Sequence, residues 1–252
     1  MSCVRVLMAG TGNALHPYRS QASVLIDDGS TPFLVDSGCF APNILARGGL
    51  KPYEVDHVIV THGHTDHYCS LPQLVFLKTF AQRGPRITVY TVPESLDLMR
   101  QAVLSASGAR EVRASYVMLR PGDSVSIGDA TIRAFEARHS VPSLSLAITT
   151  GGNKIVVSGD TAPTNRFREE AKGSTLAIHE ASLASREETS IEAKWHSTVS
   201  AAIEQVSGAE IGVFYHLSID SEKEAKETVV MNRKGAKSNL IVPEDGTTIK
   251  IC

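Results

Sequence analysis

The chain has 252 residues, of which 42% are hydrophobic and 21% are charged, and its formal net charge is −2. These proportions are typical of a globular protein with a core and exclude a disordered chain. Because the charge is close to zero, there is no global basic field, and we expect no stable DNA binding.

Short β-rich runs alternate with turns in the first third of the chain, at residues 4–8, 24–26, 33–35 and 57–60. Helical spacing follows at 71–78, with Gly84-Pro85 as its stop, and again at 94–104. A strand-rich stretch covers 115–158. Further helices are expected at 198–206 and 222–231, and strands at 211–215 and 248–251. Two groups of strands with helices between and around them predict an α/β fold of two packed sheets under outer helices. No repeat or linker interrupts the sequence, which predicts a single domain over residues 1–252.

The four cysteines are widely spaced and include no CxxC pair: Cys3, Cys39, Cys69 and Cys252. This spacing resembles neither a disulfide framework nor a cysteine-based zinc site, and it favours a reducing compartment. The first ten residues lack the pattern of a signal peptide, and the apolar runs are too short to cross a bilayer. We therefore expect a cytoplasmic protein without a membrane partner.

The densest chemical feature is the segment Thr61-His62-Gly63-His64-Thr65-Asp66-His67, directly after a short β-branched run. A loop at the end of a buried strand can turn three imidazoles and one carboxylate toward one point. Neutral imidazole nitrogen and carboxylate oxygen suit zinc, manganese or iron. A polar turn that is rich in histidine by chance is the alternative, but crowded imidazoles repel one another when protonated unless a metal organises them. The segment therefore predicts a metal site.

His62-x-His64-x-Asp66-His67 matches the metal-binding motif of the metallo-β-lactamase superfamily, and later markers follow in the expected order. Those markers are His139, Asp160, Glu180, His196 and His216. The set resembles the ribonuclease Z branch and its simpler phosphodiesterase relatives. The resemblance implies a four-layer αββα sandwich, with two mixed sheets flanked by helices. It also implies a homodimer.

The same resemblance implies two divalent metal ions per chain. Zinc is the expected metal, and manganese or iron are the alternatives. The first ion would be held by His62, His64 and His139. Asp66, His67 and His216 would hold the second ion, and Asp160 would bridge both. Such a pair lowers the pKa of a bridging water and neutralises charge on the substrate, so the implied nucleophile is a hydroxide between the ions. Asp66 could also accept the proton of that water.

Glu180 and His196 favour phosphodiester chemistry. In ribonuclease Z-like enzymes the matching glutamate orients the matching histidine, which faces the scissile group. A carboxylate partner raises the pKa of an imidazole, so His196 could donate a proton to the departing oxygen. The predicted catalytic residues are therefore Asp66, Glu180 and His196, and the predicted function is a dinuclear metal-dependent phosphodiesterase acting on a small molecule or an RNA end.

Three features depart from ribonuclease Z, and the first is that Ser37-Gly38-Cys39-Phe40 stands where that family has Gly-Glu-Gly-Thr. Only twenty residues separate His139 from Asp160, which leaves no room for the arm that grips tRNA in that family. The arginine and tyrosine that follow the last histidine motif are absent from residues 217–221. These departures weigh against tRNA processing and leave the hydrolytic centre untouched.

Several other functions remain as alternatives. A carboxylic-ester, lactone or thioester hydrolase could use the same centre. A non-catalytic binding protein of this fold usually loses ligands, whereas here every ligand position is filled. Flavodiiron oxygen reductases would carry glutamate at the position of His64, and the better-known β-lactamases would carry cysteine at the position of Asp160. Neither oxygen reduction nor antibiotic hydrolysis is therefore expected.

Near the N-terminus, Gly10-Thr11-Gly12 predicts a tight turn close to the rim of the site. His16, Pro17 and Arg19 are candidates for lining that rim. Cys69 is interpreted as a packing residue beside the ligands.

Overall fold

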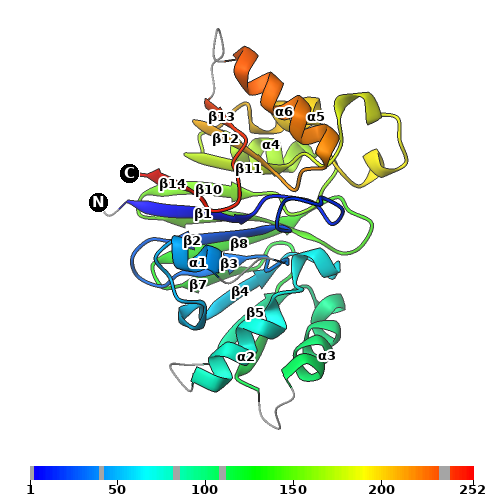
Figure 1. Ribbon diagram of the computed structural model, residues 1–252. Coiled ribbons are helices and arrows are strands. Elements are labelled where there is room, and N and C mark those ends of the chain that lie inside the picture. Colours follow the sequence, from blue (N-terminus) through cyan, green and yellow to red (C-terminus); the bar gives the residue numbers. More distant parts are fainter. Residues whose placement is uncertain (1–2, 40–42, 82–85, 108–111, 233–238) are drawn as a thin grey trace.

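The computed structural model describes residues 3–39, 43–81, 86–107, 112–232 and 239–252. Within these residues the strands form two sheets, which lie face to face with helices on both outer sides (Figure 1). No helix in the described ranges is long and apolar enough to cross a membrane.

The first sheet has the strand order β14-β1-β2-β3-β4-β5-β6. The strands are β14 (Thr247–Ile251), β1 (Val4–Gly10), β2 (Ser23–Asp27), β3 (Phe33–Val35), β4 (His57–Val60), β5 (Ile87–Thr91) and β6 (Ala114–Met118). Pairing is antiparallel from β14 to β3 and parallel from β3 to β6.

The second sheet repeats this plan in the order β13-β12-β11-β10-β9-β8-β7. The strands are β13 (Asn239–Ile241), β12 (Ile211–Tyr215), β11 (Leu176–Glu180), β10 (Asn153–Val157), β9 (Leu144–Thr150), β8 (Ala130–Glu136) and β7 (Ser124–Ile127). Pairing is parallel from β13 to β10 and antiparallel from β10 to β7. Each sheet thus has one parallel half, and the carboxyl ends of parallel strands share one edge.

Helices cover the two outer faces. The first sheet carries α1 (Asn43–Arg47), α2 (Leu71–Ala81) and α3 (Leu96–Ser107), while α4 (Asn165–Ala171), α5 (Val199–Val206) and α6 (Ile219–Asn232) lie over the second (Figure 1). Short 3-10 turns cover Pro52–Glu54, Thr65–His67, Pro93–Ser95, Ser185–Glu187 and Glu192–Lys194. The expected helix after the histidine cluster ends at Ala81, and its predicted Gly84-Pro85 stop lies outside the described residues.

The core has three layers, one between the sheets and one under each set of helices. In strand β4, the side chains alternate between two of these layers. Ile59 faces the other sheet, whereas Val58 and Val60 face the layer beneath α2 and α3. All three side chains are fully buried, and a one-residue slip would reverse their faces. The register of β4 therefore fixes where the histidine segment leaves the sheet.

The cysteine prediction is wrong. The structure pairs Cys3 with Cys252 and Cys39 with Cys69 in disulfides. β1 and β14 are antiparallel neighbours, with Val4 opposite Ile251, so the first and last cysteines meet although 249 positions separate them. Cys69, expected as a packing residue, is bonded next to the site. Spacing along the sequence could not reveal pairs that only the fold brings together.

Candidate metal and catalytic site

The predicted site residues follow strands of both sheets. His62, Asp160 and His216 lie just beyond β4, β10 and β12, and Glu180 is the last residue of β11. His139 follows the antiparallel strand β8. The ends of these strands therefore bring residues from five separate parts of the chain to one place.

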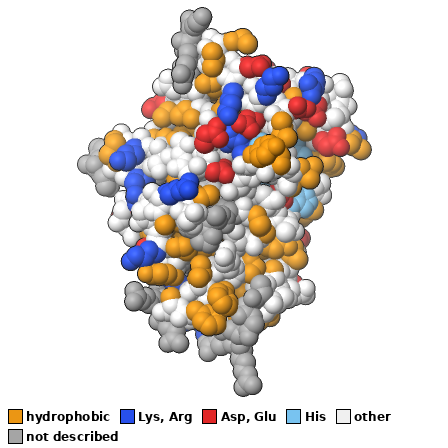
Figure 2. All heavy atoms as spheres, in the orientation of Figure 1, with side chains coloured by type: hydrophobic (Ala, Val, Ile, Leu, Met, Phe, Trp, Pro, Cys, Tyr) orange, Lys and Arg blue, Asp and Glu red, His pale blue; other side chains and the backbone are white. Residues whose placement is uncertain are grey.

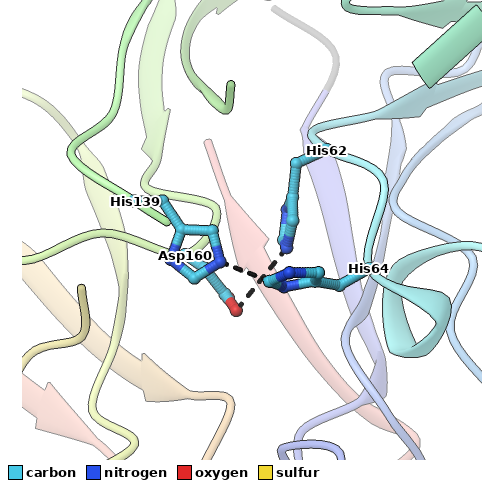
Figure 3. Close-up of side chains that lie close together, drawn as sticks. All are labelled: His62, His64, His139 and Asp160. Carbon is cyan, nitrogen blue, oxygen red and sulfur yellow. Dashed lines mark hydrogen bonds and ion pairs between the residues drawn. The ribbon is translucent and has the colours of Figure 1, made fainter. Parts of the chain in front are cut away.

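The potential metal-ligating atoms of these residues form groups, and within each group they all lie within 4.8 Å of one another. One group contains His62, His64, His139 and Asp160, which point toward one another in Figure 3. The second contains Asp66, His67 and His216. Asp160 links the groups, because its carboxylate oxygens lie 3.3 Å from His67 Nε2 and 3.4 Å from His216 Nε2. All seven predicted ligands therefore lie close together, and these two groups correspond to the two predicted sets; a third group contains Asp160, His196 and His216.

Hydrogen bonds hold the outer ring nitrogens of three histidines, while their inner nitrogens face one another or a carboxylate at the centre of the site. His67 Nδ1 lies 2.8 Å from Asp36 Oδ2, and His139 Nδ1 lies 3.0 Å from the carbonyl oxygen of Trp195. His216 Nδ1 lies 2.7 Å from Ser182 Oγ. Partners of this kind fix the tautomer and the orientation of metal-binding histidines.

The donor set fits divalent metal ions. His62 is fully buried, and its Nε2 atom has no hydrogen-bond partner among the described residues. Burial lowers the pKa of His62, so its imidazole is neutral, as ligation requires. A buried neutral nitrogen without a partner is costly unless an ion accepts its lone pair.

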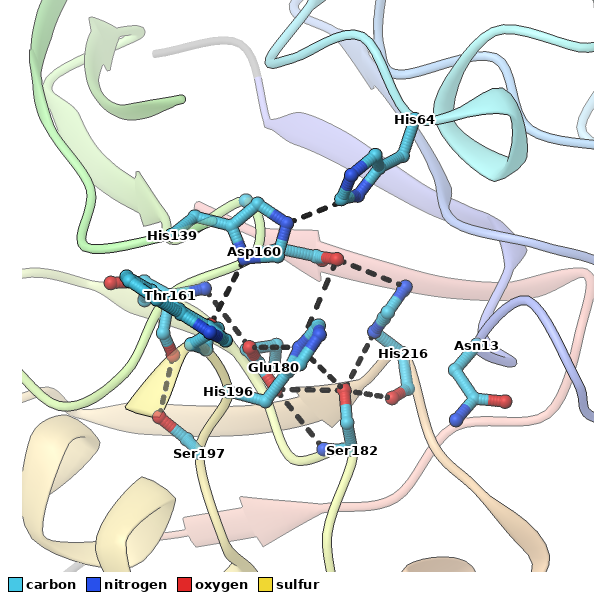
Figure 4. Close-up of polar contacts among 12 residues, drawn as sticks. Asn13, His64, His139, Asp160, Thr161, Glu180, Ser182, His196, Ser197 and His216 are labelled. Carbon is cyan, nitrogen blue, oxygen red and sulfur yellow. Dashed lines mark hydrogen bonds and ion pairs between the residues drawn. The ribbon is translucent and has the colours of Figure 1, made fainter. Parts of the chain in front are cut away.

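Glu180 and His196 form a second unit beside the ligands (Figure 4). Glu180 is fully buried, and its carboxylate accepts hydrogen bonds from Thr161 N, Ser182 N and Ser182 Oγ. His196 Nδ1 lies 2.9 Å from Glu180 Oε1. Burial opposes protonation of His196, but the charge and hydrogen bond of Glu180 outweigh it and raise the His196 pKa to about 9. At neutral pH the imidazole therefore carries a proton that it can donate.

Asp36 and Ser182 belong to the site but were not predicted. Asp36 holds His67 and also accepts from Thr61 N, while Ser182 connects Glu180 to His216. Asp36 has φ 58° and His216 has φ 54°, the two described non-glycine residues in the left-handed region. Such backbone strain is concentrated at functional sites. The sequence feature that could have indicated Asp36 is its position as a carboxylate in a turn directly after a buried strand.

The rim prediction was wrong for the loop between β1 and β2. His16 and Arg19 are buried, with 9% and 8% exposure, and neither lines the pocket. Pro17 is not among the lining residues either. Instead Asn13, Ala14 and Leu15 line it, because the side chains of His16 and Arg19 contact the Glu222 carboxylate at 2.9 and 2.7 Å.

Comparison with known proteins places the chain in a family. Residues 4–223 match the family described as anti-Pycsar protein Apyc1. The chain belongs to this family. Ribonuclease Z from Methanosarcina acetivorans is 23% identical over an alignment of 302 positions that covers 98% of each chain. A cGMP-dependent 3',5'-cGMP phosphodiesterase A from Dictyostelium discoideum is 28% identical over 173 residues, which cover 66% of this chain and 19% of that protein.

Among solved structures, the metallo-β-lactamase fold protein YhfI from Bacillus subtilis matches the whole chain with a TM-score of 0.81 at 18% identity, and all of that chain is covered. The predicted fold and the resemblance to the ribonuclease Z branch are confirmed. The segment from 140 to 159 is occupied by β9 and β10 with their connecting turn, so it forms part of the sheet rather than an arm.

Proposed function

We propose that this protein is a dinuclear metal-dependent phosphodiesterase. The observation that carries the proposal is the contact between Glu180 and His196 beside two groups of potential metal ligands. His62, His64 and His139 would hold one ion, Asp66, His67 and His216 the other, and Asp160 would bridge them. When bound, two such ions supply a water of near-neutral pKa and neutralise charge on the phosphate. Zinc is the proposed metal, with manganese or iron as alternatives.

The chain's own residues would supply proton transfer and orientation. His196 would donate its proton to the departing oxygen, and Glu180 would hold the ring in place and favour its protonated form. Asp66 Oδ2 lies 3.2 Å from His216 Nε2, and this carboxylate would accept a proton from the attacking water.

A small phosphodiester fits the pocket better than a polynucleotide. The pocket has a volume of about 370 Å³, and Glu187 and Glu192 are among its lining residues. Their carboxylates would repel a polyanion that extends beyond the scissile group. Among the relatives, one is named as a cyclic GMP phosphodiesterase, which also favours a small substrate. An RNA end is the second candidate, supported by the ribonuclease Z relatives.

The fold leaves open a carboxylic-ester, lactone or thioester hydrolase. We would assay the metal-reconstituted protein in parallel on bis(4-nitrophenyl) phosphate, a cyclic mononucleotide, a short RNA, a lactone and a thioester. Phosphodiester hydrolysis is expected to dominate, with the small substrates ahead of the RNA. Turnover of the lactone or thioester without any phosphodiester would overturn the proposal.

Two further proposals concern the protein in solution and in the cell. A homodimer follows from the resemblance to ribonuclease Z, and light scattering on the purified protein tests it. Cytoplasmic residence is also kept as a proposal, although the paired cysteines remove one of the reasons for it.

A further inference from the structure

The loop between β1 and β2 runs along the pocket and pairs with the segment that carries His216. Asn13 N donates to the carbonyl oxygen of Leu217 at 3.0 Å, and Leu217 N donates to that of Thr11 at 3.0 Å. Asn13 and His216 therefore line the same pocket wall, and Figure 4 shows the Asn13 amide beside His216.

A buried ionic cluster fixes this loop from behind. The Arg19 side chain is 3% exposed and donates to Glu222 Oε1 and to the carbonyl oxygen of Pro243, each at 2.7 Å. The Asp245 carboxylate accepts from Thr11 N at 3.0 Å and from Ser20 N at 2.5 Å, at the two ends of the loop. Charges held out of water need such partners. Since the proposed chemistry uses none of these groups, their effect is to hold the loop in one conformation.

The same loop fixes the direction of the Asn13 amide. Its Oδ1 atom accepts from Leu15 N at 3.1 Å, and a backbone N–H can only donate, so the oxygen must face Leu15. The Nδ2 atom has no hydrogen-bond partner among the described residues, and Asn13 lines the pocket together with Asp66 and Asp160. Two N–H donors are thus presented by a rigid loop to a pocket with several carboxylates.

We propose that Asn13 Nδ2 donates a hydrogen bond to a non-bridging phosphate oxygen of the substrate. The inference rests on the proposed phosphodiesterase function. An anionic phosphate among carboxylates gains from a neutral donor that is already oriented, because little ordering remains to be done on binding.

Two substitutions separate this role from support of the loop. Asn13→Asp keeps the oxygen that accepts from Leu15 N but replaces the donor by a negative charge, whereas Asn13→Ala removes both. Donation to the phosphate predicts a loss of kcat/KM on bis(4-nitrophenyl) phosphate of about tenfold to a hundredfold in Asn13→Ala, and a larger loss in Asn13→Asp. Metal content and melting temperature should stay unchanged. Wild-type kcat/KM in Asn13→Asp would overturn the proposal.

The matched control is Asn165→Ala, which removes an exposed asparagine at the start of α4, where its Oδ1 atom accepts from Arg168. Its kcat/KM should equal that of the wild type. If the wild type hydrolyses no phosphodiester, the proposed function fails, and calorimetric titration of the metal-loaded proteins with inorganic phosphate then tests Asn13 separately. At least tenfold weaker phosphate binding by Asn13→Asp supports the contact, and equal affinities overturn it.

Discussion

His196 is close enough to the ligands to raise a question about its role. Its Nδ1 atom lies 2.9 Å from Glu180 but also 3.9 Å from Asp160 Oδ2, and it forms a possible ligand group with Asp160 and His216. As a proton donor it should be dispensable for metal binding. We expect His196→Ala to lower the phosphodiesterase rate by about 10²–10⁴-fold with unchanged metal content. Loss of an ion, measured by mass spectrometry, would identify His196 as a ligand instead.

Asp36 contacts one of the proposed metal ligands from behind, because its Oδ2 atom lies 2.8 Å from His67 Nδ1. Replacing such a carboxylate typically weakens metal affinity by about tenfold to a hundredfold. Asp36→Asn should show this loss in competition with a chelator. Asp28→Asn serves as the control, since Asp28 is similarly buried but bonds to Ser30 and Thr150. Equal affinities in both variants would show that Asp36 does not tune the site.

The site residues that could be predicted from the sequence are those that form a recognisable motif. The cluster from His62 to His67 and the later histidines stand out by residue type and order. Asp36, Ser182 and Asn13 do not, because single polar residues in turns are common in any sequence. Their roles depend on which distant side chain the fold places against them.

The loop between β1 and β2 depends on the ionic cluster behind it, so its stability should depend on pH. The hydrogen bond from Arg19, followed by bonds from Lys226 and His16, lowers the pKa of Glu222 far below the usual 4.5, against burial. A carboxylate with a depressed pKa stabilises the fold above its unfolded pKa, and this stability is lost as the pH falls through the folded value. The loss should therefore begin near pH 4.5 and continue downward.

Glu222→Gln should melt at a lower temperature than the wild type at pH 7, and its melting temperature should fall less between pH 7 and pH 3. Thermal denaturation across this range measures both effects. Glu169→Gln is the control, because that carboxylate pairs on the surface with Lys172 and contributes little. Parallel pH curves for the wild type and Glu222→Gln would contradict the assignment.

Among the elements, the long and strongly patterned ones could be predicted. The expected helices at 71–78, 94–104, 198–206 and 222–231 correspond to α2, α3, α5 and α6, with ends shifted by up to three residues. Four shorter elements, α1, α4, β11 and β13, could not be predicted individually. The first two helices have five and seven residues, too few for a helical period to stand out.

The two ends of the chain meet in the first sheet, where Cys3 and Cys252 close a loop of almost the whole protein (Figure 1). A cross-link of this length restricts the unfolded chain and typically stabilises a fold by about 2–5 kcal/mol. In a Cys39→Ser/Cys69→Ser background, reduction should lower the melting temperature by roughly 5–15 °C. Adding Cys252→Ser should abolish the response to reductant. An unchanged melting temperature on reduction would show that this disulfide does not stabilise the protein.

For the whole molecule, two packed sheets under helices could be predicted from the grouping of strands, and the layer order came from the family resemblance. The cysteine pairs could not be predicted, because they depend on β14 lying beside β1 and on the approach of the loops after β3 and β4.

The distribution of charge is a second property at this scale. Acidic and basic side chains lie intermixed on the face in Figure 2, with histidines at its right-hand edge. This mixture agrees with the expectation from a net charge of −2.

The most direct test of a dinuclear phosphodiesterase is a titration of metal-free protein with zinc, in which bound metal and hydrolysis of bis(4-nitrophenyl) phosphate are followed together. Two ions per chain are expected, with activity reaching its plateau at the second equivalent. Asp160→Ala should bind fewer ions and lose activity, because its carboxylate lies between both groups. Full activity at one equivalent, or two ions retained by Asp160→Ala, would contradict a bridged pair of metals.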